Sequence, residues 1–400
     1  MKDEGVALMT VTVGIDQMGF YTPHLYLDMT ALAQARGDDP AKYHVGIGQD
    51  KQAVIPPTQD VVTMAANAAA QILTPADQKT IKMVLFGTES GVDNSKATAV
   101  YLAHLLDLPA DTRAIEIKQA CYGATAGLQF AADYVRSHPT AKVLVIGADI
   151  ARYGLRTAGE VTQGGGAVAM LVTANPRILA LDPVSSYHTA DVMDFWRPLG
   201  RSEALVDGKY STNVYLDFFR TVWTDYQAQT HRTIADFAAF AFHIPFTKMG
   251  RKALRQILPE ATPDQQTALT AAFEASQLDN RNVGNLYTGS LYLSLLSLLR
   301  HGNLQPGDRI GCYSYGSGAE GEFYSGRLQP DYRAGFNDAA VTALLAKRRA
   351  VSVAEYEELF QQQLDLTGTD VQLPVGTDPA PYYLAGRQHQ QRQYRHRSEA

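Results

Sequence analysis

Short apolar runs alternate with helix-like stretches along the first half of the chain. The apolar runs have the length of strands, and continuous ones such as Val143-Leu144-Val145-Ile146 are typical of strands buried on both faces. We expect strands at residues 10–15, 82–86, 114–117, 142–146 and 167–172, and helices at 60–72 and from 123 onward. This alternation predicts a layered α/β fold whose sheets are covered by helices.

The second half of the chain repeats the same order more loosely. Strand-like runs stand at residues 178–181, 237–243, 309–315 and 321–328, and a turn at 284–289 precedes a helix-like stretch at 290–300. Because four elements agree with the first half in order and spacing, we predict a duplication, although any long α/β chain shows some such correspondence. A duplication would place the turns of Cys121 and Asn285 symmetrically, both facing one central cleft.

The duplication divides the chain into an N-terminal half, 1–172, and a C-terminal half, 173–400. Between about 185 and 230 the second half carries inserted residues rich in Phe, Trp and Tyr, which predict a cap or an interface rather than a flexible linker. From residue 386 the tail is rich in Gln, Arg and His, and we expect it to be frayed over 386–400.

The composition is that of a soluble globular enzyme, since 46% of the 400 residues are hydrophobic and 19% are charged. A net charge of −6 gives no sign of nucleic-acid binding, although a local group of Lys and Arg can still bind an anionic ligand. With only Cys121 and Cys312, we expect no disulfide framework and a reducing cytoplasm. We expect no signal peptide, no membrane span and no zinc site, because the sequence lacks the corresponding patterns.

Cys121 is the most informative residue. It follows the strand expected at 114–117 and precedes a helix-like stretch that opens with Gly123 and Ala124. The positive end of a helix dipole favours a thiolate, so this position predicts a reactive cysteine with a lowered pKa. The alternative is a buried structural cysteine, because free cysteines are among the most buried residues.

Glu89 directly follows the buried strand expected at 82–86. Ligands bind at strand ends in α/β folds, and an acid held there among apolar neighbours can have a raised pKa and act as a general acid or base. The alternative is a carboxylate in the first turn of a helix, with Thr88 or Ser90 as the cap.

His243 ends the strand expected at 237–243. The usual outcome for a lone histidine in such a position is a core residue with satisfied hydrogen bonds. Lys248, Arg251 and Lys252 follow at helical spacing, which predicts either a phosphate-facing cluster at the mouth of the cleft or a solvated helix face.

Together with Asn285, these residues suit carbon–carbon bond formation on thioesters. A thiolate accepts an acyl group and keeps it activated as a thioester. A base removes a proton from the carbon next to a carbonyl, and hydrogen-bond donors stabilise the enolate oxygen that results.

Long ordered motifs from about residue 10 to 384 carry a family resemblance. They are Phe-Gly-Thr-Glu89-Ser, Gln-Ala-Cys121-Tyr-Gly-Ala-Thr, Gly-Ala-Asp149-Ile-Ala-Arg-Tyr153, Thr162-Gln-Gly-Gly-Gly-Ala-Val-Ala, Asp194-Phe195-Trp-Arg-Pro, Val-Asp-Gly-Lys-Tyr-Ser, Phe-His243-Ile-Pro-Phe-Thr-Lys248-Met, Gly-Asn285-Leu-Tyr-Thr-Gly-Ser and Ser-Tyr-Gly-Ser317-Gly. The chain resembles the bacterial form of the hydroxymethylglutaryl-CoA synthase family, of the thiolase superfamily. The tail beyond Leu384 does not share the resemblance.

The resemblance implies a thiolase-like fold, in which duplicated βαβαβαββ halves form α-β-α-β-α layers with an inserted cap. It implies that Cys121 is the acetylated nucleophile, that Glu89 is the general acid/base, and that His243 binds and polarises acetoacetyl-CoA. The substrate-binding residues that it implies are Asp149, Tyr153, Thr162, Asp194, Phe195, Lys248, Lys252, Asn285, Tyr287 and Ser317, with the two lysines on coenzyme A.

The reaction implied is the condensation of acetyl-CoA with acetoacetyl-CoA and water to 3-hydroxy-3-methylglutaryl-CoA and CoA. It proceeds through acetyl-Cys121 and belongs to the mevalonate pathway of isoprenoid synthesis. The resemblance also implies a cytoplasmic homodimer that needs no cofactor and no metal, because the coenzyme A thioesters are substrates.

Three other interpretations of the chain stay open. A ketoacyl synthase shares the Cys–His–Asn set but has no acid that matches Glu89. A thiolase would use a second cysteine as its base, and Cys312 stands within an expected strand, which predicts a structural role. A non-catalytic subunit that binds acyl-CoA would be expected to have lost Glu89, Cys121 or His243.

Overall fold

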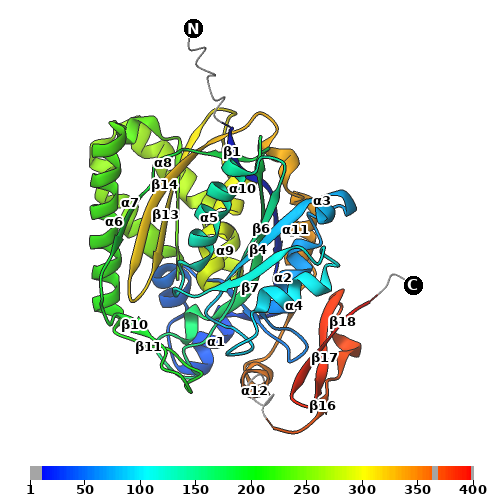
Figure 1. Ribbon diagram of the computed structural model, residues 1–400. Coiled ribbons are helices and arrows are strands. Elements are labelled where there is room, and N and C mark those ends of the chain that lie inside the picture. Colours follow the sequence, from blue (N-terminus) through cyan, green and yellow to red (C-terminus); the bar gives the residue numbers. More distant parts are fainter. Residues whose placement is uncertain (1–10, 363–367, 398–400) are drawn as a thin grey trace, which may run out of the picture.

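The computed structural model describes residues 11–362 and 368–397. At its centre is a ten-stranded sheet with the order β12-β13-β14-β8-β1-β7-β6-β4-β5, in which β9 also pairs with β14 (Figure 1). The strands of the first half are β1 (Val13–Tyr21), β4 (Ile81–Gly87), β5 (Arg113–Ile117), β6 (Lys142–Ala151) and β7 (Gly164–Ala174). Those of the second half are β8 (Leu179–Leu181), β9 (Ser186–Thr189), β12 (Ala239–Phe242), β13 (Arg309–Gly316) and β14 (Glu320–Leu328).

Strand pairing repeats between the two halves. In the first half β1 and β7 are antiparallel, β7 and β6 are antiparallel, and β6 and β4 are parallel. In the second half β8 and β14, β14 and β13, and β13 and β12 follow the same three relations. The predicted correspondence of these strands is therefore confirmed, whereas the division at residue 172 stays a prediction. The halves meet where Gly14 and Ile15 of β1 pair with Ala180 and Leu179 of β8.

Two central helices occupy the space between the strands of the two halves (Figure 1). Helix α5 (Gly123–Ser137) contacts β4 and β6, and its Thr125 hydroxyl donates to Ser314 of β13 at 2.8 Å. Helix α10 (Ser290–His301) contacts β12 and β13 from the second half. The outer faces are covered by α2 (Val61–Ala69) on β7 and β1, and by α6 (Gly208–Thr230) on β14 and β9. The predicted α-β-α-β-α layers are thus confirmed.

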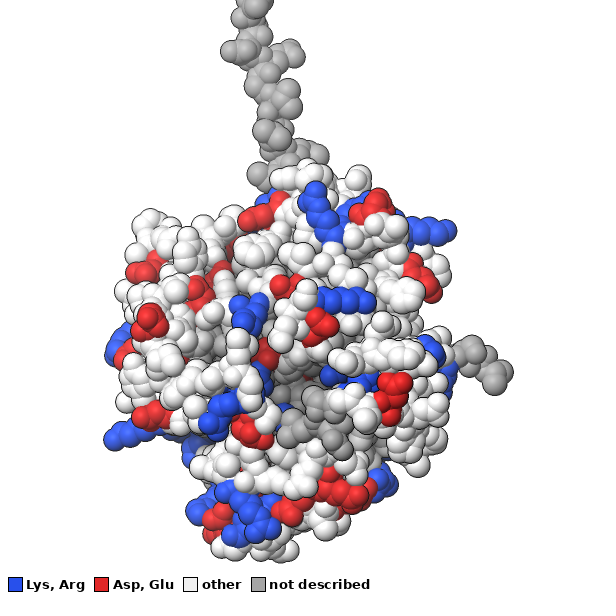
Figure 2. Space-filling view, turned by 60° about the horizontal axis from the view of Figure 1, so that its bottom comes forward, with Lys and Arg blue, Asp and Glu red and all other residues white. Residues whose placement is uncertain are grey.

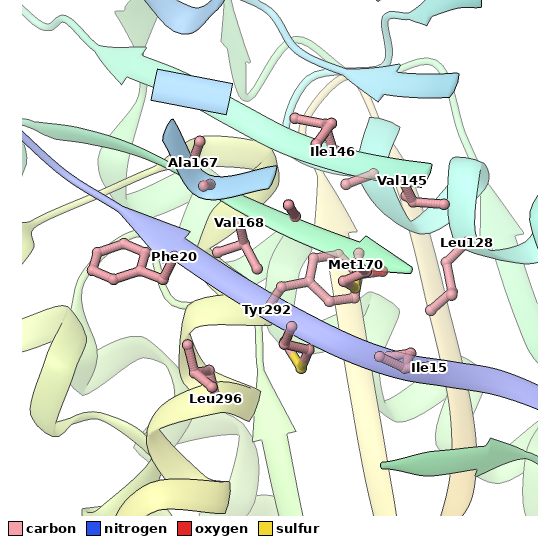
Figure 3. Packing of buried hydrophobic residues seen from close by; sticks show 14 of the residues in the cluster. Ile15, Phe20, Leu128, Val145, Ile146, Ala167, Val168, Met170, Tyr292 and Leu296 are labelled. Carbon is pink, nitrogen blue, oxygen red and sulfur yellow. The ribbon is translucent and has the colours of Figure 1, made fainter. Parts of the chain in front are cut away.

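The largest core cluster lies between the first-half strands and the central helices. Figure 3 shows Tyr292 and Leu296 of α10 near the β1 and β7 side chains Ile15, Phe20, Val168 and Met170, with Leu128 of α5 close by. These side chains are almost fully buried, which explains why the strands are continuous apolar runs in the sequence.

The aromatic side chains of the region predicted to be an inserted cap are largely core. Tyr215, Phe219, Trp223 and Tyr226 on α6 are buried in a second cluster, which also contains Phe323 of β14. The prediction that these aromatic residues mark a cap or an interface is therefore wrong for α6, because that helix forms the outer layer of the second half. Before it come two short strands, β10 (Phe195–Trp196) and β11 (Leu205–Val206).

The prediction of a frayed tail is wrong for the part that the structure describes. Strands β17 (Tyr382–Gln388) and β18 (Gln391–His396) form an antiparallel hairpin. It is anchored because Tyr394 and Arg392 donate to Oδ2 of Asp60 at 2.7 and 3.1 Å, and Asp60 also caps the N-terminus of α2. Residues 398–400 lie outside the described part.

The remaining elements surround these layers. The strands are β2 (Leu25–Asp28), β3 (Lys51–Val54), β15 (Arg349–Ala350) and β16 (Val371–Gln372), and the helices are α1 (Met29–Arg36), the π-helix η1 (Lys42–Ile47), α3 (Pro75–Thr80), α4 (Thr98–Leu105), α7 (Thr247–Ile257), α8 (Pro263–Ser276), α9 (Leu278–Val283), α11 (Asp338–Ala346) and α12 (Val353–Gln362). Over residues 11–362 and 368–397, no helix combines the length and the apolar character that a membrane crossing requires.

Candidate active site

Cys121 lies in a tight turn at the N-terminus of α5. Tyr122 is the N-cap residue, and the helix begins at Gly123. The start of the helix rests directly on the end of β4, because a Cβ atom added at Gly87 would lie 2.3 Å from the backbone nitrogen of Ala124. This contact brings the turn of Cys121 beside the residues that follow β4, which include Glu89.

Glu89 and Cys121 are in direct contact, as their strand-end positions predict. The Sγ of Cys121 lies 3.5 Å from Oε1 of Glu89 in hydrogen-bond geometry, and the Glu89 side chain is 8% exposed. The site therefore brings a thiol and a carboxyl group together at one point. The Glu89 carboxylate can accept the proton of the Cys121 thiol.

Asp149 on β6 accepts hydrogen bonds from the residues around this contact. Its Oδ1 accepts hydrogen bonds from the Glu89 backbone N–H and from the hydroxyls of Thr88 and Ser90, at 2.8 to 2.9 Å. Its Oδ2 accepts from the N–H and the hydroxyl of Thr288, at 3.1 and 2.6 Å. The residue is 0% exposed and joins turns from both halves, and its implied role in substrate contact stays a prediction.

The pKa of Cys121 is raised, which corrects the prediction of a lowered value. Burial is the main cause, followed by the negative charges of Glu89, Asp149 and Asp194. Helix-dipole stabilisation is worth about 0.3–1 kcal/mol at exposed sites and cannot offset the burial of the sulfur among acidic side chains. Cys121 is therefore a thiol at neutral pH and needs a base to attack.

Glu89 can be that base. Burial, assisted by the charge of Asp149, raises the pKa of Glu89 to about 8, while Arg197 acts in the opposite direction. A base whose pKa lies near the operating pH is the most effective kind. The prediction of a raised pKa at Glu89 is confirmed.

Arg197 is a site residue that the sequence reasoning passed over. Its Nη2 lies 3.5 Å from Oε2 of Glu89 and also donates to the Glu89 backbone carbonyl. The residue follows β10, in the inserted region, and it stands inside the motif that contains Asp194 and Phe195. Its place in that motif is the only signal that could have revealed it, because the sequence around it otherwise resembles that of a surface arginine.

An aromatic cluster adjoins Cys121. The rings of Tyr153, Phe195 and Tyr287 meet edge to face, with centroids 5.8 to 6.0 Å apart. Cys121 and Tyr153 pack against the buried cluster that contains Phe195 and Tyr287. Edge-to-face packing fixes the orientation of these rings and gives the thiol an apolar wall.

Asn285, from the second half, is hydrogen-bonded to two residues of this aromatic cluster. Its Nδ2 donates to the hydroxyl of Tyr153 at 3.1 Å, and its Oδ1 accepts from Tyr287 N–H and the Ser290 hydroxyl, at 2.8 and 2.9 Å. The backbone N–H of Asn285 donates to the carbonyl of Thr162 at 3.2 Å. The predicted convergence of the Cys121 and Asn285 turns is therefore found, with Tyr153 between them.

Asp194 shapes the turn that carries Ser317. Its Oδ1 accepts from the N–H of Gly318 at 2.9 Å, and its Oδ2 accepts from the hydroxyls of Tyr315 and Ser211, at 2.7 and 3.0 Å. Asp194 is 0% exposed, and its implied role in substrate contact stays a prediction. The Ser317 carbonyl accepts from Nε2 of Gln119 at 3.4 Å, which ties this turn to the turn of Cys121.

His243 follows β12 and is 2% exposed. Its backbone N–H donates to Tyr313 of β13, and its carbonyl accepts from the Tyr215 hydroxyl, both at 2.8 Å. Burial lowers the pKa of the imidazole to about 3, so the ring is neutral near pH 7. Its Nδ1 is buried and has no hydrogen-bond partner within the described part of the chain, which departs from the fully satisfied core histidine of the alternative interpretation.

The two lysines implied for coenzyme A lie in different surroundings. Lys248 lines a surface hollow of about 420 Å³ between α7, α9 and η1, together with Arg251, Arg255 and Arg281. Lys252 lies 5.9 Å from the ring centre of Phe246 and is not part of the hollow's wall. Figure 2 shows Lys and Arg side chains interspersed with Asp and Glu on one face of the molecule.

The fold and the site together define a class. Two like halves share one sheet, a cysteine begins the central helix, and an acid from the neighbouring strand end contacts it. These features are those of an acyltransferase-type condensing enzyme with the thiolase-like fold.

Comparisons with known proteins specify this class further. The family described as "Hydroxymethylglutaryl-coenzyme A synthase N terminal" matches residues 9–177, and the corresponding C-terminal family matches 179–273 and 265–370. The hydroxymethylglutaryl-CoA synthase of Enterococcus faecalis is 49% identical over 96% of this chain and 100% of its own length. The polyketide-biosynthesis 3-hydroxy-3-methylglutaryl-ACP synthase PksG of Bacillus subtilis is 34% identical over 88% of each chain.

A solved structure agrees with these relatives. A crystal structure of HMG-CoA synthase complexed with CoA superposes with a TM-score of 0.93 and 42% identity, over 96% of this chain and 100% of that one. The chain belongs to the hydroxymethylglutaryl-CoA synthase family.

The second cysteine is structural, as predicted. Cys312 lies in β13, is 0% exposed, and has a pKa raised to about 12 by burial. It cannot serve as the second catalytic cysteine of a thiolase.

Proposed function

We propose that this chain condenses acetyl-CoA with acetoacetyl-CoA and water to form 3-hydroxy-3-methylglutaryl-CoA and CoA, through an acetyl-Cys121 intermediate. The observation that carries the proposal is the contact between the Cys121 thiol and the Glu89 carboxyl at 3.5 Å. Family membership supports the overall reaction, and a role in the mevalonate pathway is part of the proposal. No cofactor is required, because the reacting acyl groups arrive as thioesters.

The first step is acetyl transfer. Glu89 accepts the thiol proton of Cys121 as the sulfur attacks the acetyl carbonyl, and it returns the proton to the departing CoA thiolate. The backbone N–H groups of Cys121 and Ser317 are the proposed donors to the thioester oxygen. Gly318 is a poorer candidate, because its N–H already donates to Asp194.

The second step is condensation, followed by hydrolysis. Glu89 removes a proton from the acetyl methyl group, and the resulting enolate attacks the ketone carbon of acetoacetyl-CoA beside His243. The new alkoxide recovers the proton from Glu89. Water then cleaves the Cys121 thioester and releases the product. The aromatic wall of Tyr153, Phe195 and Tyr287 excludes bulk water, which strengthens these electrostatic interactions.

The direct test is mass spectrometry after brief exposure to acetyl-CoA alone, and then product analysis after acetoacetyl-CoA is added. One acetyl group should appear on Cys121 and should disappear as 3-hydroxy-3-methylglutaryl-CoA forms. An enzyme that never becomes acetylated, or that is acetylated and gives no condensation product, would contradict the proposal. The first outcome would favour a non-catalytic acyl-CoA-binding subunit.

We expect His243→Ala to separate the two steps. The mutant should form acetyl-Cys121 at nearly the wild-type rate but should use acetoacetyl-CoA poorly. The reason is that a neutral imidazole with an unpaired Nδ1 can hydrogen-bond the second substrate. A positioned catalytic group typically contributes on the order of 10²–10⁴ in rate. The measurement compares the rate of acetylation with the rate of condensation, and an equal loss of both would contradict the assignment.

A second candidate function is condensation on an acyl carrier protein, since PksG is named for that reaction. The cationic hollow favours free coenzyme A. Four residues of its wall are cationic: Lys248, Arg251, Arg255 and Arg281. The nucleotide end of coenzyme A carries phosphates, which a group of cationic side chains can bind. Acetoacetyl-pantetheine and a carrier-bound acetoacetyl group both lack that nucleotide.

We therefore expect Lys248→Gln to raise the KM for acetoacetyl-CoA by roughly tenfold, since a hydrogen bond to a charged group is worth about 1.5–3 kcal/mol. The KM for acetoacetyl-pantetheine should not change. The control is Lys347→Gln, at an exposed lysine that ends α11 and should affect neither value. Equal effects on both substrates, or a wild-type preference for the carrier-bound substrate, would favour the second candidate.

The proposal includes a cytoplasmic homodimer. Its support is the edge strand β5, which has a partner on one side only, where it pairs with β4. Ile115 on β5 is 50% exposed, and Phe130 on α5 is 57% exposed. An unpaired edge strand with exposed apolar side chains is a ready surface for a second copy.

A further inference from the structure

Glu322 is a buried acid in β14 that the reaction steps above do not use. It is 2% exposed, and it faces the N-terminal part of α5 from the second half. Its Oε2 accepts from the hydroxyl of Tyr122 at 2.6 Å, and its Oε1 accepts from Nε2 of Gln129 at 2.8 Å. Both carboxylate oxygens are thus engaged with one helix.

These contacts fall on one face of α5. Tyr122, Thr125 and Gln129 are spaced by three and four residues, which places them on the same side of a helix. Thr125 also bonds the second half, through Ser314 of β13 and Tyr292 of α10, both at 2.8 Å. This face therefore fixes the position of α5 against the second half.

Tyr122 is the residue next to the nucleophile. Its ring is held between the end of β13 and Glu322, because a Cβ atom added at Gly316 would lie 2.7 Å from the Tyr122 Cβ. On the other side the turn rests on Gly87, at the end of β4. Cys121 thus lies in a turn that is fixed from both halves, and its distance to Glu89 depends on both contacts.

We propose that Glu322 is a positioning residue that holds Cys121 in its reactive position through Tyr122 and Gln129. The inference rests on Cys121 as the acetylated nucleophile. An ionised carboxylate makes stronger, shorter hydrogen bonds than a neutral acceptor, so Glu322 fixes the turn best when ionised. Misplacing a reacting group by about 1 Å can cost on the order of 10²-fold in rate.

The surroundings of Glu322 bring its pKa near neutral pH, so its charge depends on the pH in that range. Burial raises the pKa of Glu322 to about 7, and the hydrogen bonds from Tyr122 and Gln129 act against that rise. The groups that interact with it are Tyr122, Gln129, Ser185, Tyr292, Glu320 and Tyr324. Of these, Glu320 is the second carboxyl group, and its charge acts in the same direction as burial.

The test compares Tyr122→Phe, Glu322→Leu and Glu322→Gln with wild type in two assays. The first is acetylation of Cys121 by acetyl-CoA, and the second is alkylation of Cys121 by iodoacetamide, both well below the melting temperature. Tyr122→Phe and Glu322→Leu should slow both reactions by about tenfold or more. Glu322→Gln keeps a hydrogen-bond acceptor of the same shape without the charge, so its rates should lie between those of wild type and Glu322→Leu.

The matched control is Glu320→Gln, which removes a carboxyl group two residues away that accepts a hydrogen bond from Thr189. Its rates should stay within about twofold of wild type. The inference is overturned if Tyr122→Phe and Glu322→Leu lower only the melting temperature, or if Glu320→Gln is as slow as Glu322→Leu. If Glu322→Leu does not fold, Tyr122→Phe alone decides. Failure of wild-type acetylation would contradict the proposed function instead, because alkylation would still report the position of Cys121.

Discussion

Cys121→Ala is expected to abolish both acetylation and condensation while leaving the protein folded. No other described thiol can replace it, because Cys312 is fully buried in β13. The substitution removes only the Sγ atom from a partly exposed turn, so the melting temperature should change little. Mass spectrometry after exposure to acetyl-CoA, together with a melting curve, measures both properties.

A matched control is available in Cys312→Ala. This mutant loses a buried thiol and should melt at a lower temperature, because it leaves a small cavity in the sheet. It should still be acetylated once, on Cys121. Condensation by Cys121→Ala above a tenth of the wild-type rate would show that the nucleophile lies elsewhere.

Glu89→Gln is expected to stop the reaction after acetyl transfer. The mutant loses the base that removes the methyl proton, and a positioned base contributes on the order of 10²–10⁴ in rate. Acetylation should continue at a reduced rate, because the mutant loses the acceptor of the thiol proton, while removing the charge of Glu89 lowers the pKa of the Cys121 thiol and compensates in part. Acetyl-enzyme should therefore accumulate, and solvent deuterium should not exchange into its methyl group. Normal condensation by the mutant would reduce Glu89 to a structural acid and would favour a ketoacyl-synthase-like mechanism.

The same substitution has a pH-dependent effect on stability. In the folded wild type Glu89 has a pKa of about 8, against an ordinary value of 4.5. The folded state thus keeps a proton that the unfolded state releases, so this group costs stability as the pH rises from 4.5 towards 8, by at most about 1.4 kcal/mol per pH unit. Glu89→Gln lacks this cost and should melt at a higher temperature than wild type at pH 8, with the difference vanishing below pH 4.5. A difference that does not depend on pH would contradict the raised pKa.

The strands β6 and β7 could be predicted because they contain continuous apolar runs, at 143–146 and 167–172. Their bounds could not be predicted fully. Strand β6 continues to Ala151 and β7 begins at Gly164, and these added segments contain Gly, Ala and Asp instead of large apolar residues. The hairpin of the tail was missed because its anchor, Asp60, is more than three hundred residues away along the chain.

The contact between Glu89 and Cys121 could be predicted because both residues occupy turns where strands end. Two properties of the site required the structure. The thiol pKa depends on how many carboxylates surround a buried sulfur, and Asp194 reaches it from the inserted region of the second half. The hydrogen bonds of Asp149 and Asp194 to neighbouring turns also required the structure, because a motif shows that an acid is present but not which way it faces.

The junction of β1 and β8 limits how this enzyme can move. The backbone pairs Gly14–Ala180 and Ile15–Leu179 join the two halves into a single sheet, and the carboxylate of Asp149 links turns from both. A clamshell motion that opened the site would have to break these hydrogen bonds in a buried region, at a cost of about 1–3 kcal/mol for each group left unpaired. The approach to Cys121 is therefore set by a fixed scaffold and not by a hinge between the halves.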